Sequence, residues 1–280
     1  MNHHFPVLLD EVIETLVTDI DGVYVDCTLG FGGHSAAILK KISKHGFLIG
    51  LDLDPYALNK AKEELEKTGY KQFSVHHASY QEFPKILSKL GIDKVNGFLF
   101  DLGISSYQID SEHRGFSYMK EGPLDMRFNP RGEKTAKDVL LKISERDLID
   151  ALQVYAEIGK AGKIAKQIIH ERDKKNMNTT SDLKQAVFRA IGDTCSNKIL
   201  SRIFQAIRII VNDEIKSFKN TLFKAPDYLI KGGRISVISF HSIEDRIVKH
   251  FFKDATMINE HNYHDREKKA ITNTLNPITK

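Results

Sequence analysis

Short apolar runs alternate with helical patterns over the first hundred residues of the chain. The apolar runs predict four strands, at 23–27, 47–52, 73–76 and 95–101. Between the second and third runs, Asp54 is a suitable N-cap, Pro55 suits the first helical position, and an apolar face continues to Gly69. Strands that alternate with helices are typical of βαβ units, so the pattern predicts a parallel sheet.

The alternation stops after Asp101 for more than a hundred residues. This stretch contains helix starts that resemble capping boxes, at Thr135 and Ser144, and a continuous helical pattern from about 198 to 223. The pattern therefore predicts a mostly helical insert within an α/β protein.

A fifth strand is expected after this insert. Gly232 and Gly233 turn the chain into an apolar run at 234–240. Because the run returns to the α/β pattern, two separate segments should build the sheet. The expected division is a first sheet segment, a helical insert and a second sheet segment, at 1–108, 109–212 and 213–280.

The composition is that of a soluble globular protein. The chain has 280 residues, of which 41% are hydrophobic and 28% charged. No run approaches the roughly 18 consecutive apolar residues of a membrane helix. The first residues lack the basic and apolar regions of a secretory signal. Cys27 and Cys195 lie too far apart to suggest a zinc motif or a disulfide framework, so we expect a cytoplasmic protein.

The positive charge is concentrated in the middle of the chain. The net charge is +4, but residues 105–224 alone carry 22 Lys and Arg against 16 Asp and Glu. Such a surplus is typical either of a solvated surface or of a segment that binds a polyanion. The charge by itself leaves both interpretations open.

The first predicted strand leads into a glycine-rich turn. Gly30, Gly32 and Gly33 follow Asp26 in a G-x-G-G pattern, whereas the dinucleotide fingerprint is G-x-G-x-x-G. A carboxylate at Asp26 would repel a pyrophosphate and attract a cationic ligand such as S-adenosylmethionine. Asp52 ends the second strand, where a carboxylate can accept hydrogen bonds from ribose hydroxyls. The pattern favours a methyl donor over a dinucleotide, and the alternative is a turn that only links strand to helix.

Several motifs along the chain are more specific. They are HFPVLL at 4–9, TLGFGGHS at 28–35, DLGISSYQ at 101–108, RGFSY at 114–118, GPLDMR at 122–127, FQAIRI at 204–209 and SFHSIEDR at 239–246. In this order they closely resemble the bacterial 16S ribosomal RNA (cytosine-N4) methyltransferase family, the MraW or RsmH family. The resemblance covers the whole chain.

The resemblance implies a Rossmann-like S-adenosylmethionine methyltransferase with a helical domain inserted after the fourth strand. It implies methylation of the exocyclic N4 amine of one cytosine in the decoding region of 16S rRNA, with the small ribosomal subunit as partner and the insert as RNA-substrate domain. The residues that it assigns to the cofactor are Gly32, Gly33, His34, Asp52, Tyr80, Asp101 and Gln108. Tyr80 stands where the family usually has Phe, and either ring can pack on adenine.

Two features depart from the family. Its acidic Tyr-Gly-Glu-Glu segment is replaced at 155–158 by Tyr-Ala-Glu-Ile, and the chain stops at Lys280, before an Arg-rich segment and a final strand. We therefore expect a truncated form of a longer chain. Residues 270–275 would at best start a sixth strand, the residues from about 257 onward would pack poorly, and the fifth strand would expose an unpaired edge.

Methyl transfer to cytosine N4 needs positioning, because the amine lone pair is delocalised into the ring. Acceptors for the amine hydrogens would add to the rate. Asp101 and His241 follow predicted strands and are the candidate catalytic residues. The alternatives are that Asp101 only holds the cofactor, and that His241 caps the next helix or contacts a phosphate.

Candidate RNA contacts lie in the insert. Lys160, Lys163 and Lys166 recur at a spacing of three, which places them near one helical face that can contact phosphates. RNA specificity would then come from shape and from an unstacked base. The aromatic residues available to stack on such a base, or to pack in the core, are Phe116, Tyr118 and Phe128.

No metal site is expected. The histidine pairs at 3–4, 76–77 and 261/264 have no carboxylate or cysteine at ligand spacing. Two other functions compete with rRNA methylation: a small-molecule methyltransferase, which the basic insert disfavours, and an RNA-binding scaffold without turnover. The oligomeric state stays open, with a homodimer among the alternatives.

Overall fold

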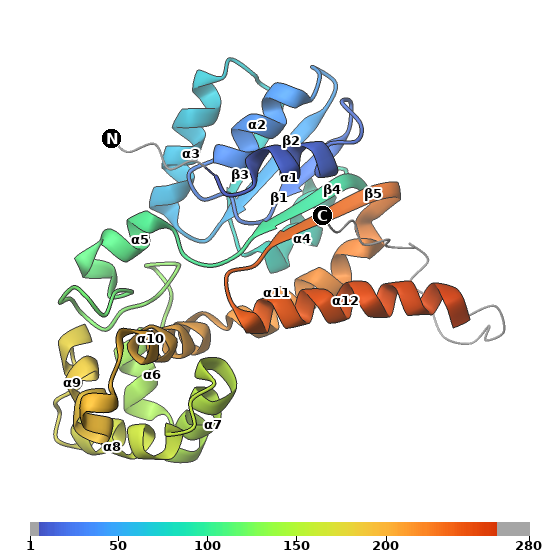
Figure 1. Ribbon diagram of the computed structural model, residues 1–280. Helices are drawn as coiled ribbons and strands as arrows, with labels where there is room; N and C mark the ends of the chain where they lie inside the picture. Colours follow the sequence, from blue (N-terminus) through green and yellow to red (C-terminus); the bar gives the residue numbers. More distant parts are fainter. Residues whose placement is uncertain (1–5, 262–280) are drawn as a thin grey trace. The chain divides into compact units, whose positions relative to one another are not determined.

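The computed structural model describes residues 6–261, with side chains described as far as Lys253. The chain forms two compact units (Figure 1). The first combines the segment up to Gly103 with the segment from Lys216 onward, and the second spans Ile104–Ile215. The boundaries expected from the sequence, after residues 108 and 212, differ from these by a few residues.

The first unit contains a five-stranded parallel sheet with strand order β3-β2-β1-β4-β5. The strands are β1 (Val23–Asp26), β2 (Phe47–Asp52), β3 (Phe73–His77), β4 (Val95–Asp101) and β5 (Leu229–Ile238). The helices are α1 (Leu9–Leu16), α2 (Gly33–Lys41), α3 (Pro55–Lys67), α4 (Phe83–Lys89), α11 (Glu214–Lys224), which starts two residues before this unit, and α12 (Ser242–His261), with 3₁₀ turns at Tyr80–Glu82 and Ala225–Tyr228. This order, in which β1 is central and the chain reverses direction across the sheet, confirms the predicted Rossmann-like class.

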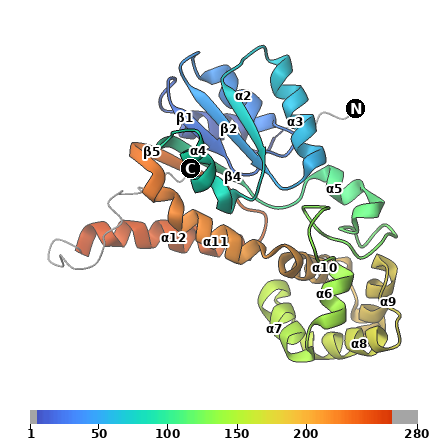
Figure 2. The same ribbon diagram turned by 180° about the vertical axis from the view of Figure 1, so that it is seen from behind.

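Both faces of the sheet are covered by helices (Figures 1 and 2). Tyr24, Leu48 and Leu99 belong to one core with α1, α2 and α3, whereas Val25 and Phe98 belong to a second core with α4, α11 and α12. Successive residues of a strand point to opposite faces, so continuous apolar runs supply both cores at once. This explains why the strands show unbroken apolar stretches in the sequence.

The local signals for α3 act as predicted. The Asp54 carboxylate accepts a hydrogen bond from the Tyr56 N–H, Pro55 stands at the start of the helix, and Gly69 follows it with a φ of +81°. An N-cap side chain satisfies one of the free N–H groups at the start of a helix.

The fifth strand differs from its prediction. It begins at Leu229, before the two glycines, and ends at Ile238. The register with β4 shifts between the Val95–Leu229 and Gly97–Arg234 pairs. Gly232, at a φ of +85°, takes up this irregularity inside the strand. The glycines therefore lie at an irregularity inside β5 and do not precede it as a turn.

The far edge of β5 has no strand partner among the described residues, because β5 pairs only with β4 there. Helix α12 reaches His261. The expected start of a sixth strand at 270–275 lies outside the described residues.

The second unit is helical. Its helices are α5 (Ser106–Asp110), α6 (Ala136–Lys142), α7 (Glu145–Ala156), α8 (Ala161–Asp173), α9 (Thr180–Ile191) and α10 (Asn197–Asn212), with 3₁₀ turns at Glu112–Arg114 and Gly192–Thr194. The predicted caps are present, since the Thr135 and Ser144 side chains accept hydrogen bonds from the Asp138 and Asp147 N–H groups. These helices enclose one apolar core of their own.

The continuous helix predicted from about 198 to 223 is wrong. Asp213 has a φ of +50° and ends α10, and α11 starts at the next residue. The apolar pattern runs through this position, so the break leaves little trace in the sequence. No helix within the described residues is long and apolar enough to cross a membrane.

Candidate active site

Three parallel strands end in aspartates at one edge of the sheet. Asp26, Asp52 and Asp101 are the last residues of β1, β2 and β4. Strand β1 pairs with both β2 and β4, so the three aspartates follow neighbouring strands. Open α/β sheets bind ligands at this carboxyl edge, where the strand order reverses. The edge is therefore the candidate ligand site.

The turn after β1 depends on two glycines. Gly30 and Gly32 have φ angles of +53° and +83°, a region that other residues rarely adopt. Gly32 is the N-cap of α2, which begins at Gly33. Gly33 is exposed. Backbone without side chains is thus available for the close approach of a ligand.

Asp52 joins the glycine turn to the next helix. One carboxylate oxygen accepts a hydrogen bond from the Gly30 N–H at 2.7 Å, and the other accepts from the Asp54 N–H at 2.8 Å. The residue as a whole is partly exposed. Since each oxygen has a second lone pair, the geometry is compatible with the expected ribose contact. Asp52 has a second role, which is to hold the turn in its shape. The sequence pattern did not predict this role.

Asp26 is enclosed by the protein. Its carboxylate accepts hydrogen bonds from the Ser35 hydroxyl at 2.7 Å and the Thr28 N–H at 3.1 Å, and the residue is only 1% exposed. Burial raises the pKa of this carboxyl. Asp26 therefore links β1 to the first turn of α2, and any effect on a cationic ligand would be exerted without direct exposure.

Asp101 is more accessible than Asp26, because 28% of its side chain is exposed. Its backbone N–H donates to the Thr28 hydroxyl at 2.6 Å. This bond joins β4 to the glycine turn, and no local sequence signal marks it. Its Oδ2 lies 3.5 Å from Nδ1 of His34. The other ring nitrogen of His34 lies 3.0 Å from the Val7 carbonyl, which can only accept a hydrogen bond. The buried His34 side chain thus connects the segment just before α1 to Asp101.

The last two expected cofactor residues lie in separate units. Tyr80 belongs to the first unit, where its half-buried ring packs edge-on against Phe100 at 6.1 Å. Gln108 belongs to the second unit and is buried. Its side-chain oxygen accepts from the Ser105 N–H at 3.1 Å, which forms a capping box at the start of α5.

The Asp52 carboxyl should make cofactor affinity depend on pH. Burial is the main cause that raises its pKa to about 7. Hydroxyl donors favour the ionised carboxylate, so protonation below this pH should weaken binding. We expect S-adenosylmethionine affinity, measured by calorimetry, to fall about tenfold from pH 8 to pH 6, as one titrating group allows. Asp52→Asn should bind with nearly constant affinity over this range, and an equally flat wild-type profile would contradict the assignment.

His241 lies between β5 and α12 and contacts Glu244 with both ring nitrogens. Nδ1 accepts from the Glu244 N–H at 3.3 Å, and Nε2 lies 3.1 Å from the Glu244 carboxylate. The contact with the N–H is that of a helix cap. Capping is one of the two alternatives to a catalytic role that the sequence left open for His241. A direct role of His241 toward a substrate stays a prediction.

Only two of the three regularly spaced lysines lie on a helix. Lys163 and Lys166 are exposed on α8. Lys160 is the N-cap residue of α8, and its ammonium donates to the Thr194 hydroxyl at 2.9 Å. The predicted basic face therefore consists of two lysines on α8 with Lys160 at its start.

The three aromatic residues considered for base stacking contribute to the core of the second unit. Phe116 is 6% exposed and stacks on Phe128 with ring centroids 5.8 Å apart. Tyr118 packs edge-on against Phe204 at 6.0 Å. Core packing, one of the two alternatives, therefore accounts for all three rings.

Among the residues with described side chains, no three His, Cys, Asp or Glu are grouped in a way that could hold a metal ion. The rings of His76 and His77 contact the Ser74 hydroxyl and the Leu53 carbonyl, each at 2.9 Å. The pair at residues 3–4 and the side chains of the 261/264 pair lie outside this description.

Comparison with known proteins matches the chain to one family throughout its length. The MraW methylase family matches residues 1–279. Ribosomal RNA small subunit methyltransferase H of Caldicellulosiruptor bescii is 46% identical over 254 residues, which are 90% of this chain and 82% of that protein. The proteins of the same name from Thermosipho africanus and Fervidobacterium nodosum are 42% and 41% identical, and cover 92% and 99% of this chain and 88% and 91% of their own lengths.

These matches confirm the resemblance inferred from the motifs. They also agree with S-adenosylmethionine as the expected cofactor, since a methylase needs a methyl donor and the glycine turn and carboxylates lie where an α/β sheet holds one. The chain belongs to the MraW methylase family.

Proposed function

We propose that this protein methylates the exocyclic N4 amine of a cytosine in the decoding region of 16S rRNA, with S-adenosylmethionine as methyl donor. The observation that carries the proposal is the similarity, over most of the chain, to methyltransferases named for the small-subunit ribosomal RNA. The small ribosomal subunit, or its rRNA, is accordingly the proposed partner.

The sheet edge has the chemistry that a cationic nucleoside requires. Asp26, Asp52 and Asp101 all lie near it, and such a group of carboxylates disfavours a pyrophosphate. Asp52 would hold the ribose, and the turn at 30–33 would allow backbone approach. When bound, S-adenosylmethionine supplies an electrophilic methyl group.

Asp101 is the proposed acceptor for the substrate amine. Its carboxylate is partly exposed at the end of β4, and its backbone is fixed by Thr28. An acceptor that binds one amine hydrogen orients the nitrogen and stabilises the positive charge that develops on it. The methylated nitrogen then loses a proton readily, so a strong general base is not required.

The lysines at the start of and along α8 should contribute nonspecific RNA affinity. Replacing Lys160, Lys163 and Lys166 with alanine removes three charges from this surface. We expect weaker rRNA binding and a flatter dependence of log K on log salt, by up to about three units of slope. Filter binding between 50 and 200 mM salt measures this. S-adenosylmethionine affinity should stay constant, and an unchanged salt slope would show that the lysines are merely solvated.

The direct test is transfer of tritium from labelled S-adenosylmethionine to small ribosomal subunits and to free 16S rRNA, followed by nucleoside analysis. The expected product is labelled N4-methylcytidine at one position. Label in another nucleoside would overturn the proposed target. Label in small molecules alone would favour a small-molecule methyltransferase, and RNA binding without any transfer would favour a scaffold.

A further inference from the structure

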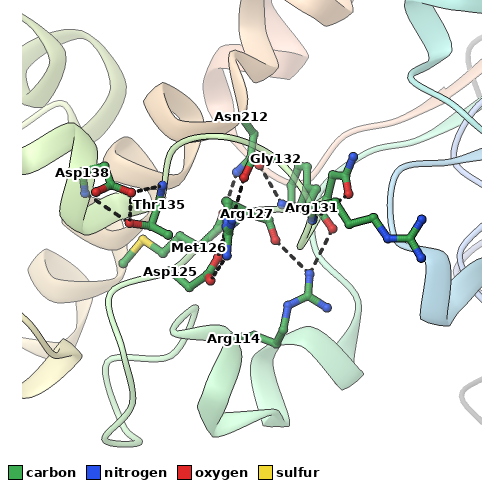
Figure 3. Close-up of polar contacts among 11 residues, drawn as sticks. Arg114, Asp125, Met126, Arg127, Arg131, Gly132, Thr135, Asp138 and Asn212 are labelled. Atoms are coloured by element: carbon green, nitrogen blue, oxygen red, sulfur yellow. Dashed lines mark hydrogen bonds and ion pairs between the residues drawn. The ribbon is translucent and has the colours of Figure 1, made fainter.

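In one loop of the second unit, residues 125–132, many backbone N–H and C=O groups are hydrogen-bonded to side chains (Figure 3). We call it the braced loop. The Arg127 guanidinium binds the Asp125 carboxylate with two hydrogen bonds, at 2.8 and 2.6 Å, and donates a third to the Gly132 carbonyl at 2.6 Å. One arginine thus joins the two ends of the loop.

Two residues from other elements hold the middle of the braced loop. Buried Arg114 donates to the carbonyls of Arg127 and Phe128, at 2.8 and 3.0 Å. Asn212, at the end of α10, accepts from the Phe128 N–H at 2.7 Å and donates to the Met126 carbonyl at 2.8 Å. These contacts span up to 86 positions of sequence. The loop conformation is therefore imposed by the whole unit.

The braced loop also contains strained backbone. Met126 is completely buried and has a φ of +57°, which is uncommon for a residue with a side chain. Strain of this kind persists only where the surroundings over-determine it, and it is concentrated at functional positions. The hydrogen bonds from Arg114, Arg127 and Asn212 supply that determination here.

Arg131 is the cation that this arrangement presents. Its N–H donates to the Asn129 side chain at 3.0 Å, and the Gly132 N–H donates to the Asn129 carbonyl at 2.8 Å, so the backbone on both sides is fixed. The Arg131 side chain is exposed and points away from the hydrogen-bonded centre of the loop (Figure 3). No described carboxylate lies within ion-pair distance of it.

Two carboxylates lie close to Arg131 in the sequence, and neither forms an ion pair with it within the described residues. Asp125 is neutralised by Arg127, and exposed Glu133 is followed directly by exposed Lys134. A free guanidinium binds phosphate oxygens through a planar pair of donors. Because the backbone of the loop is already ordered, such a contact has to fix only the Arg131 side chain.

We propose that the braced loop is a preformed phosphate-binding element for the RNA substrate, with Arg131 as its contact and Asn212 as a positioning residue. The inference rests on the proposed rRNA methylation and adds a specific contact to it. The basic surface of α8 would supply affinity by charge alone, whereas Arg131 would bind one phosphate in a fixed position.

The first test compares three variants in tritium transfer and filter binding with small ribosomal subunits. Arg131→Ala should raise the KM for subunits and the Kd about tenfold and reduce the salt slope by about one unit, with kcat at saturation and S-adenosylmethionine affinity unchanged. Arg131→Lys, which keeps the charge, should retain the salt slope. Arg146→Ala removes an arginine that is also exposed, from α7, and should change the KM less than about threefold.

The second test asks whether the loop positions Arg131. Asn212→Ala should raise the KM for subunits about as much as Arg131→Ala, and the double variant should be little worse than either single one, because a released loop no longer presents the arginine. Additive effects would overturn the positioning role of Asn212. Circular dichroism and S-adenosylmethionine affinity show whether Asn212→Ala is folded.

The outcomes separate the two proposals. Wild-type transfer to cytosine N4 with no effect of Arg131→Ala beyond that of Arg146→Ala would overturn the braced loop as an RNA contact and leave the proposed function intact. No wild-type transfer to any subunit preparation would overturn the proposed function, and filter binding with Arg131→Ala would still report whether the loop binds RNA.

Discussion

Replacing Asp52 with alanine should weaken S-adenosylmethionine binding by about 1–3 kcal/mol, or roughly 5- to 150-fold in Kd, the usual effect of removing a charged hydrogen-bonding partner. The loss has two sources. The variant removes the expected acceptor for the ribose hydroxyls, and it also leaves the N–H groups of Gly30 and Asp54 without the carboxylate that holds them. Calorimetry with purified protein measures the change.

Glu66→Ala is the matched control for Asp52→Ala. Glu66 is an exposed carboxylate on α3 of the same unit, and it forms an ion pair with Lys62 at 4.0 Å. Its removal should leave cofactor affinity within about twofold, because exposed ion pairs contribute little. An Asp52→Ala protein that is folded by circular dichroism and binds with wild-type affinity would show that β2 does not hold the ribose.

Replacing Glu214 with alanine should destabilise the second unit by about 3–5 kcal/mol. The Glu214 carboxylate accepts two hydrogen bonds from Arg208, at 2.9 and 3.0 Å, and the two residues are only 7% and 8% exposed. Truncation leaves a buried guanidinium without its anion, which is far more costly than the loss of a surface pair. Native-state hydrogen exchange of the α10 amides measures the free energy of opening of this unit separately from the sheet.

Asp110→Ala is the control in the same unit. Asp110 pairs with Lys120 at 3.3 Å, but its side chain is 72% exposed, so the change should cost less than about 1 kcal/mol. If Glu214→Ala cost no more than this, the buried pair would not be a determinant of the stability of the second unit.

The sequence predicted much of the sheet because its signals are local. The predicted bounds of β2 and β4 agree with the structure, and the N-cap at Asp54 is present. A cap involves groups within one helical turn, and an apolar run needs only its own side chains to mark a buried strand. The same signals failed at Asp213, where a single left-handed residue divides α10 from α11.

Some features of the candidate site can also be predicted from the sequence, and others cannot. The glycine pattern and the aspartates at the strand ends are visible in the sequence, and parallel pairing brings them to one edge. Their individual uses are not visible. Asp26 is buried on Ser35 and Thr28, whereas Asp101 remains partly exposed. The difference depends on which neighbours exclude water from each carboxylate, and residue type does not encode that.

By itself the sequence determined the parallel α/β architecture, the helical insert, the glycine turn and the family. Only the tertiary structure decided which polar groups form the contacts that hold the protein together. Asn212 fixes a loop 84 positions away, and Arg208 is committed to Glu214 while Arg131 stays free of ion pairs within the described residues. The physical reason is that secondary structure follows from interactions over a few residues, whereas a buried polar group must find its partner among whatever segments the fold brings near it.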